Sequence, residues 1–83
     1  MALSLESKLV IYWRKKRGVS KSELARRLGI SPQAVSQWDS GVTSPRRRIQ
    51  EIAEALGLTV SGFWGAQEAV QGGTDSQIAA ANG

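Results

Sequence analysis

The side chains that could do chemistry in this sequence are hydroxyls, amides and cations, because the chain contains neither cysteine nor histidine. Their absence removes thiol chemistry, Cys/His zinc sites and imidazole-based catalysis. Glu23 and Asp39, the two acids among the basic residues, both have local structural explanations, so no nucleophile, base and orienting group can be assembled. We therefore expect no enzyme, no metal and no cofactor, and the remaining chemistry is binding.

The cationic side chains are confined to one part of the chain. All eleven Lys and Arg residues lie between Lys8 and Arg48, where the two acids leave nine net positive charges, while residues 49–83 hold four acids and no base. Such segregation is typical of a surface that binds phosphates while the rest of the molecule avoids the polyanion. The alternative is a basic face that is only solvated. The positions of the basic residues must distinguish this alternative from a phosphate-binding surface.

Hydrophobic periodicity and capping residues predict short helices as the elements that position these side chains. Glycines end the segments, and Ser20 with Glu23 has the spacing of a capping box, in which each side chain satisfies a backbone amide of the other residue. The apolar run at residues 9–13 has no second strand candidate to pair with, and it is far shorter than the roughly 20 residues of a membrane span. We expect helices over about 5–17, 21–28, 32–39 and 45–56, and a last turn or two over 60–64.

A very short turn joins the second and third predicted helices. Gly29 ends one helix, Ser31 caps the next, Pro32 occupies its first position, and only Ile30 lies between the glycine and the serine. Such a tight joint makes two helices cross at a large angle. The segment is therefore predicted to be a helix-turn-helix.

The outward face of the 32–39 helix carries amides and a hydroxyl. With Val35 and Trp38 turned inward, the outward positions are Pro32, Gln33, Ser36 and Gln37. A helix fits the major groove of DNA, where glutamine can bond adenine through N6 and N7 and serine can bond either kind of base. Proline offers only apolar contact, for instance to a thymine methyl. Ordinary surface glutamines are the alternative.

The residues from Ser20 to Gly41 carry a resemblance to a known family. The run Ser20-Lys-Ser-Glu-Leu-Ala-Arg-Arg-Leu-Gly-Ile-Ser-Pro-Gln-Ala-Val-Ser-Gln-Trp-Asp-Ser-Gly, followed by Ser44-Pro45 and Ile52-Ala-Glu-Ala-Leu-Gly57, resembles the lambda-repressor-like, Cro or XRE type of helix-turn-helix domain. The likeness covers roughly residues 10–64. It implies an all-α, five-helix domain over residues 1–65 that binds operator DNA, usually as a homodimer, in phage repressors and bacterial regulators.

The resemblance implies a sequence-specific transcriptional regulator, most simply a cytoplasmic repressor with double-stranded DNA as partner. The 32–39 helix would dock in the major groove of a pseudo-palindromic operator. In the family, the early positions of this helix contact bases, and the position of Gln37 contacts a base or its phosphate. Base readout is therefore expected from Gln33, Ser36, Gln37 and Pro32.

Phosphate contacts are expected on both sides of the base-reading helix. Ser20 and Lys21 stand at a helix start, where free amides favour an anion, and the family uses these positions in this way. Three arginines at the next helix start oppose its dipole, which costs stability and suggests a use. Arg47 matches a family position that reaches the DNA backbone. The full set of candidates is Ser20, Lys21, Ser40, Thr43, Ser44, Arg46, Arg47, Arg48 and Arg14.

Arg14 has two expected roles. It falls where the family places an arginine that pairs with an acid at the end of the recognition helix, here Asp39. The pair would tie the first helix to the third, and Arg14 could instead touch a phosphate. We expect the structural role first, because an aspartate exposed toward DNA would be repulsive unless neutralised.

Aromatic residues near the end of the domain exceed what a small core needs. Phe63 and Trp64 are expected to form or adjoin a dimer or partner surface, because the family commonly dimerises after its fourth helix. An antitoxin-like or coactivator-like interaction module is the alternative function, and in that case these residues and Tyr12, rather than the glutamines, would carry affinity. Residues 66–83 are expected to form a flexible tail or the start of a linker to a further domain or protein partner.

Overall fold

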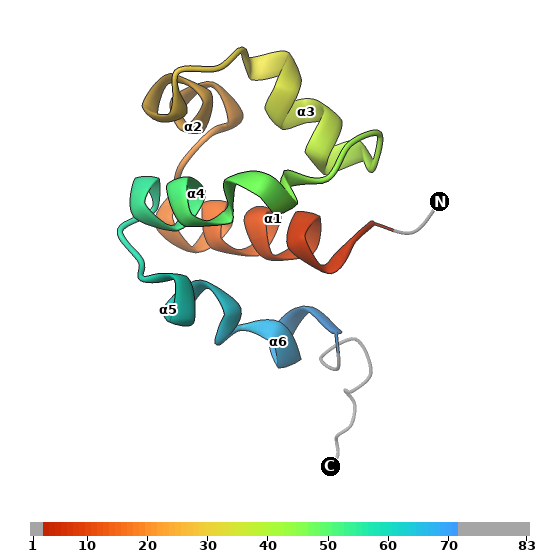
Figure 1. Cartoon of the computed structure of the whole chain (residues 1–83), viewed down its shortest axis with the longest axis vertical. Coiled ribbons are helices and arrows are strands. Elements are labelled where there is room, and N and C mark those ends of the chain that lie inside the picture. Colours follow the sequence, from red (N-terminus) through yellow and green to blue (C-terminus); the bar gives the residue numbers. More distant parts are fainter. Residues whose placement is uncertain (1–2, 72–83) are drawn as a thin grey trace.

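Helices follow one another along residues 3–71, the part of the chain that the computed structural model describes (Figure 1). No strand occurs within this range, so the predicted all-α fold is confirmed. None of the helices there is long and apolar enough to cross a membrane. The elements are α1 (Leu5–Arg17), α2 (Lys21–Leu28), α3 (Pro32–Ser40), the 3-10 turn η1 (Pro45–Arg48), α4 (Ile49–Ala55), α5 (Val60–Trp64) and α6 (Gln67–Gln71).

Hydroxyl caps begin four of the helices, and those at Ser20, Ser31 and Thr59 were predicted. The side chains of Ser4, Ser20, Ser31 and Thr59 each accept a hydrogen bond from the backbone N–H three residues later. The capping box at Ser20 is only half formed, because the Glu23 carboxylate accepts from arginines of its own helix instead of from the backbone. Serine capping is therefore sufficient to start α2.

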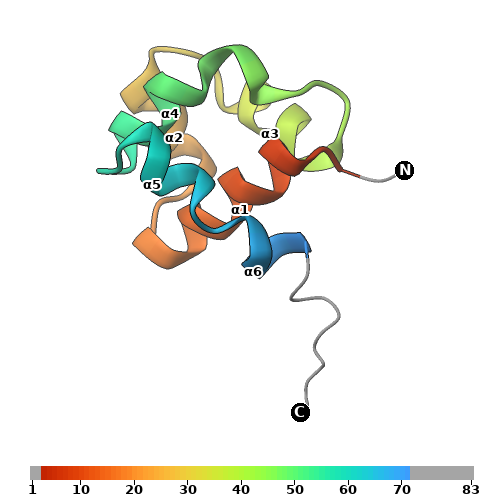
Figure 2. The same cartoon turned by 60° about the horizontal axis from the view of Figure 1, so that its bottom comes forward.

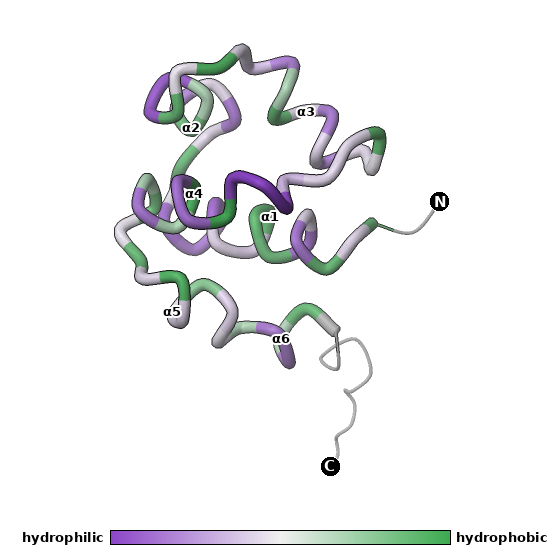
Figure 3. Tube along the Cα trace, in the orientation of Figure 1, coloured by the Kyte–Doolittle hydropathy of each residue, from purple (hydrophilic) through white to green (hydrophobic). Residues whose placement is uncertain are grey.

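The core lies where α1 and α4 cross the middle of the molecule (Figure 1). The helix pair α2 and α3 covers one end of this layer, and α5 and α6 cover the other (Figure 1). In Figure 2 the molecule is turned so that the end with α5 and α6 comes forward. In Figure 3 the most strongly hydrophilic segment of residues 3–71 is η1, which connects α3 to α4. The fully buried side chains of largest volume include Phe63, Leu9, Leu24, Ile52 and Val35.

Two boundaries differ from the sequence expectation. The helix predicted to begin at Pro45 opens as a 3-10 turn, in which the Ser44 hydroxyl accepts from the N–H of Arg46, and regular α-helix begins at Ile49. The flexible tail predicted from residue 66 is wrong for its first part, because Ala66 is buried and α6 packs on α1. The remainder of that prediction, residues 72–83, lies outside the described residues.

Candidate nucleic-acid interface

The predicted helix-turn-helix is present and its turn is held by backbone hydrogen bonds. Gly29 adopts a left-handed conformation with φ of 72°, which lets the N–H of Ile30 donate to the Ala25 carbonyl at 3.0 Å. Ser31 then caps α3 directly. The turn therefore sets α3 at the outer end of the molecule, against α2 and above α1 in the view of Figure 1.

The exposed side of α3 carries the four predicted positions. Val35 and Trp38 are buried, whereas Pro32 and Gln33 are exposed and Ser36 and Gln37 are partly exposed. A shallow depression of about 510 Å³ runs along this side, and its lining residues are Lys21, Gln33, Ser36, Gln37, Asp39 and Ser40. The structure thus brings candidate base readers and the cation of Lys21 to one surface.

An ion-pair cluster ties α1, α2 and α3 together beneath this surface. The Nη2 atom of Arg14 donates to Oδ2 of Asp39, and the predicted pair is therefore confirmed. The Nζ atom of Lys21 lies 3.9 Å from the same oxygen. The side chains of Arg14 and Asp39 are only 11% and 15% exposed. Two cations thus balance the carboxylate at the end of α3, which removes the repulsion that it would exert on a phosphate.

The same geometry bears on the two expected roles of Arg14. Its guanidinium is largely buried and engaged by Asp39, and its Nε atom is enclosed as well, so it offers little to a ligand at the surface. Lys21, by contrast, is about half exposed at the start of α2. The geometry therefore supports a structural role for Arg14 and leaves Lys21 as the cation of this cluster that can reach a phosphate.

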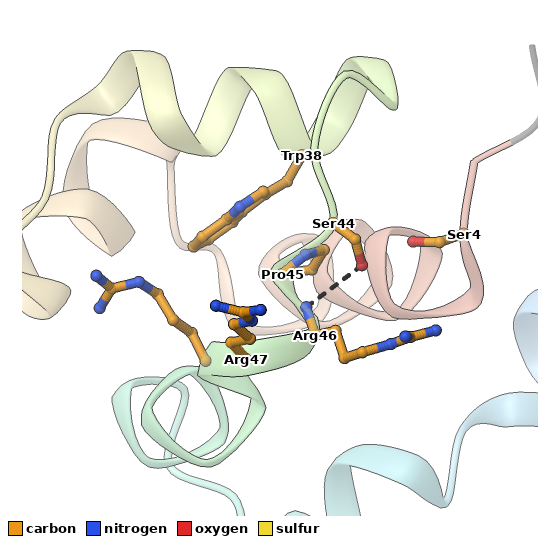
Figure 4. A pocket seen from close by; sticks show the side chains of 7 residues that line it. Ser4, Trp38, Ser44, Pro45, Arg46 and Arg47 are labelled. Carbon is orange, nitrogen blue, oxygen red and sulfur yellow. Dashed lines mark hydrogen bonds between the residues drawn. The ribbon is translucent and has the colours of Figure 1, made fainter.

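Three arginines line a second pocket, of about 510 Å³, between α3 and η1 (Figure 4). Trp38 reaches into it from α3, and Arg46 and Arg47 extend from η1 below the indole in this view. The Nε atom of Arg46 lies 3.6 Å from a Glu6 carboxylate oxygen, and Nη1 of Arg48 donates to Glu51 at 2.9 Å. Within residues 3–71, no carboxylate lies within 4 Å of Arg47. Of the three arginines, Arg47 therefore keeps its charge most available.

The hydroxyl candidates lie at the start of α2, at the end of α3 and in the loop that follows α3. Ser20 is exposed, with its oxygen occupied as a helix cap, while Thr43 and Ser44 are exposed in the loop after α3. The Ser40 hydroxyl donates to the Gln37 carbonyl at 3.3 Å, and the N–H of Thr43 donates to the same carbonyl. Thr43 is thus held against the end of α3, whereas Ser44 lines the pocket of the three arginines and Ser40 lines the depression along α3.

Two long-range hydrogen bonds had no signal in the sequence. Nη1 of Arg27 donates to the Ala55 carbonyl at 2.7 Å, where it caps the last turn of α4, and Nε1 of Trp13 donates to the Phe63 carbonyl at 3.0 Å. Glu23, one turn before Arg27, was expected in a capping box with Ser20, and its carboxylate instead pairs with Arg26 and Arg27. Hydrogen bonds from Arg26 and then Arg27 hold the pKa of the Glu23 carboxyl below its usual range.

The expected partner surface at Phe63 and Trp64 needs correction. Phe63 is fully buried, because its ring packs in the core with residues of α1 and α4. It therefore cannot contact a partner. Trp64 is half-buried and packs edge-to-face on Phe63, with 5.6 Å between ring centroids. The alternative function as an interaction module thereby loses one of its expected contact residues.

The five helices α1 to α5 and the tight turn between α2 and α3 define a repressor-like helix-turn-helix domain. Residues 10–63 match the family model described as Helix-turn-helix, and the chain belongs to this HTH_3 family. A similar curated protein is the HTH-type transcriptional regulator for conjugative element SXT from Vibrio cholerae, 49% identical over 47 residues. That match covers 57% of this chain and 21% of the regulator, so the matched residues span about a fifth of that protein.

Solved structures with the same fold include a repressor domain and part of an enzyme. The DNA-binding domain of the P22 c2 repressor aligns with a TM-score of 0.65 at 22% identity, over 87% of this chain and 93% of that one. Hydroxypropylphosphonic acid epoxidase from S. wedmorenis aligns with a TM-score of 0.60 at 24% identity, over 75% of this chain and 34% of the epoxidase. Because the same fold occurs in part of an enzyme, a function must be argued from the surface of α3 and its flanks.

Proposed function

We propose that this chain is the DNA-binding domain of a transcriptional regulator that places α3 in the major groove of an operator. The observation that carries the proposal is the exposed side of α3, where Gln33, Ser36 and Gln37 share a surface with Lys21. The similarity to a named transcriptional regulator supports the same function. A cytoplasmic repressor is the simplest version of such a protein.

The base-reading roles follow from the chemistry of these side chains. Gln33 and Gln37 are each suited to bond adenine through N6 and N7, and Ser36 to donate to or accept from either kind of base. Pro32, exposed at the first position of α3, has only apolar atoms to offer and suits a thymine methyl.

The phosphate-binding roles are divided between the two flanks of α3. On one flank are Ser20 and Lys21, at the capped start of α2. On the other flank are Ser40, Thr43, Ser44, Arg46, Arg47 and Arg48. If about four phosphates are neutralised per subunit, the affinity of a dimer falls with salt along a log–log slope of roughly −7. Such contacts set the register on the duplex without reading its sequence.

A homodimer is part of the proposal. An isologous pair of subunits sets its two α3 helices about one duplex turn apart, roughly 34 Å, and therefore requires a pseudo-palindromic site. Trp64, which retains exposed surface after its contact with Phe63, remains our candidate for a position in or near the dimer contact.

The test is selection of bound sequences from a random duplex pool, followed by Gln33→Ala and Gln37→Ala on the selected site. Each variant should weaken operator binding by about 1–3 kcal/mol and leave binding to random duplex unchanged. Gln67→Ala is the matched control, because Gln67 is exposed on α6 at the opposite end of the molecule (Figure 1). Equal affinity of the wild-type chain for every duplex, or for none, would overturn the proposal.

A further inference from the structure

Two large hydrophobic residues stand out as exposed among residues 3–71, and one of them borders the proposed DNA surface. Val42 is 69% exposed in the loop after α3, and Val60 is 39% exposed on α5. Single exposed apolar residues are common on proteins, so exposure alone assigns no role. The position of Val42, between Ser40 on α3 and the hydroxyls of Thr43 and Ser44, is what separates it from Val60.

The backbone of Val42 is fixed to the candidate reading helix. Gly41 ends α3 in a left-handed conformation with φ of 83°, and the N–H of Val42 donates to the Gln37 carbonyl at 2.9 Å. The residue thus sits at a set distance from a side chain proposed to contact a base. A β-branched side chain also has few rotamers, so its isopropyl group is held in place before any partner arrives.

The residues around Val42 are mainly polar or basic. Amides and hydroxyls on α3 match the polar edges of bases, and the arginines of η1 match phosphates. None of these polar groups favours the C5-methyl of thymine, which is the one apolar group that base pairs present in the major groove. Pro32, at the start of α3, is suited to one such methyl, and Val42 adds a second exposed apolar group beyond the end of the helix. An exposed isopropyl group is suited to such a methyl.

We propose that Val42 contacts a thymine methyl group of the operator and so specifies one T·A pair at the edge of the half-site, a role that rests on the proposed function. The contact removes two apolar groups from water on the cognate sequence only. Deoxyribose could also cover the valine, but a sugar is present at every nucleotide and would add affinity without preference.

The experiment combines a protein substitution with a base substitution. Val42→Thr keeps the shape and the β-branch but replaces one methyl by a hydroxyl, and deoxyuridine replaces each operator thymidine in turn, which removes only the C5-methyl. We expect Val42→Thr to weaken operator binding about fourfold per half-site, the effect of one buried methyl. One uridine position should weaken the wild-type chain by a similar factor and should cost the Val42→Thr variant nothing further.

Val60→Thr is the matched control, since Val60 is an exposed valine on α5, at the end of the molecule away from α3 (Figure 1). It should leave operator affinity and the uridine effect unchanged. Unfolding curves of both variants should coincide with that of the wild type, because neither side chain is buried.

Several outcomes would overturn the role of Val42. Equal weakening on operator and random duplex would assign the valine to deoxyribose, and loss of dimer in sedimentation with no uridine effect would assign it to a protein contact. Additive losses from Val42→Thr and every uridine would mean that the valine touches no methyl. If the wild-type chain selects an operator but shows none of the expected coupling, only this inference fails; if it selects no sequence, the proposed function fails with it.

Discussion

The two ends of the molecule treat charge and burial in opposite ways. At the α2–α3 end, cations and amides stand exposed around α3 and η1, and Arg46–48 occupy a helix start whose dipole disfavours them. At the α5–α6 end, residues 60–71 include no lysine or arginine, and the ring of Phe63 is buried in the core. The difference separates the surface that we propose binds DNA from the part of the molecule that stabilises the fold.

Removing the ring of Phe63 should have the largest effect, and on stability. Phe63→Ala leaves a cavity in the core and should cost about 3–5 kcal/mol of unfolding free energy, measured by urea denaturation. Trp64→Ala, at the half-buried neighbour, is the control and should cost clearly less. If the two losses are equal, the α5 end does not have the division between core and surface that we describe.

Breaking the Arg14–Asp39 pair should come next. Arg14→Ala leaves a mostly buried carboxylate with only Lys21 nearby, and it should lower stability by about 3 kcal/mol. Adding Asp39→Ala should restore part of this loss, because no unpaired charge then remains. The double variant should also keep the wild-type salt slope on DNA. A slope lowered by one or more would place Arg14 among the phosphate contacts.

Arg47→Ala should have the smallest effect on stability and a selective one on binding. It should weaken operator and random duplex to a similar extent and lower the log–log salt slope by about 1 per subunit, because one phosphate contact is lost. Arg26→Ala is the control, since Arg26 is an exposed arginine on α2 whose charge Glu23 already neutralises. Equal changes in slope for both variants would indicate general attraction rather than a located contact.

Features that depend on neighbouring residues could be predicted from the sequence by itself. Serine caps and the glycines that end α1, α2 and α3 act within one helical turn, so the bounds of these helices and the outward positions of α3 were predicted within a residue or two. The Arg14–Asp39 pair came from the family resemblance, and the structure contains it.

Only the tertiary structure decided the remaining features, because they depend on contacts between distant parts of the chain. Trp13 bonds a carbonyl 50 residues away and Arg27 one 28 residues away, distances at which periodicity carries no information. Phe63 is equally apolar as a core residue or a partner contact, and the space left between α1 and α4 placed it in the core. The apolar side of α6 likewise became structured because α1 offered a surface on which to bury it.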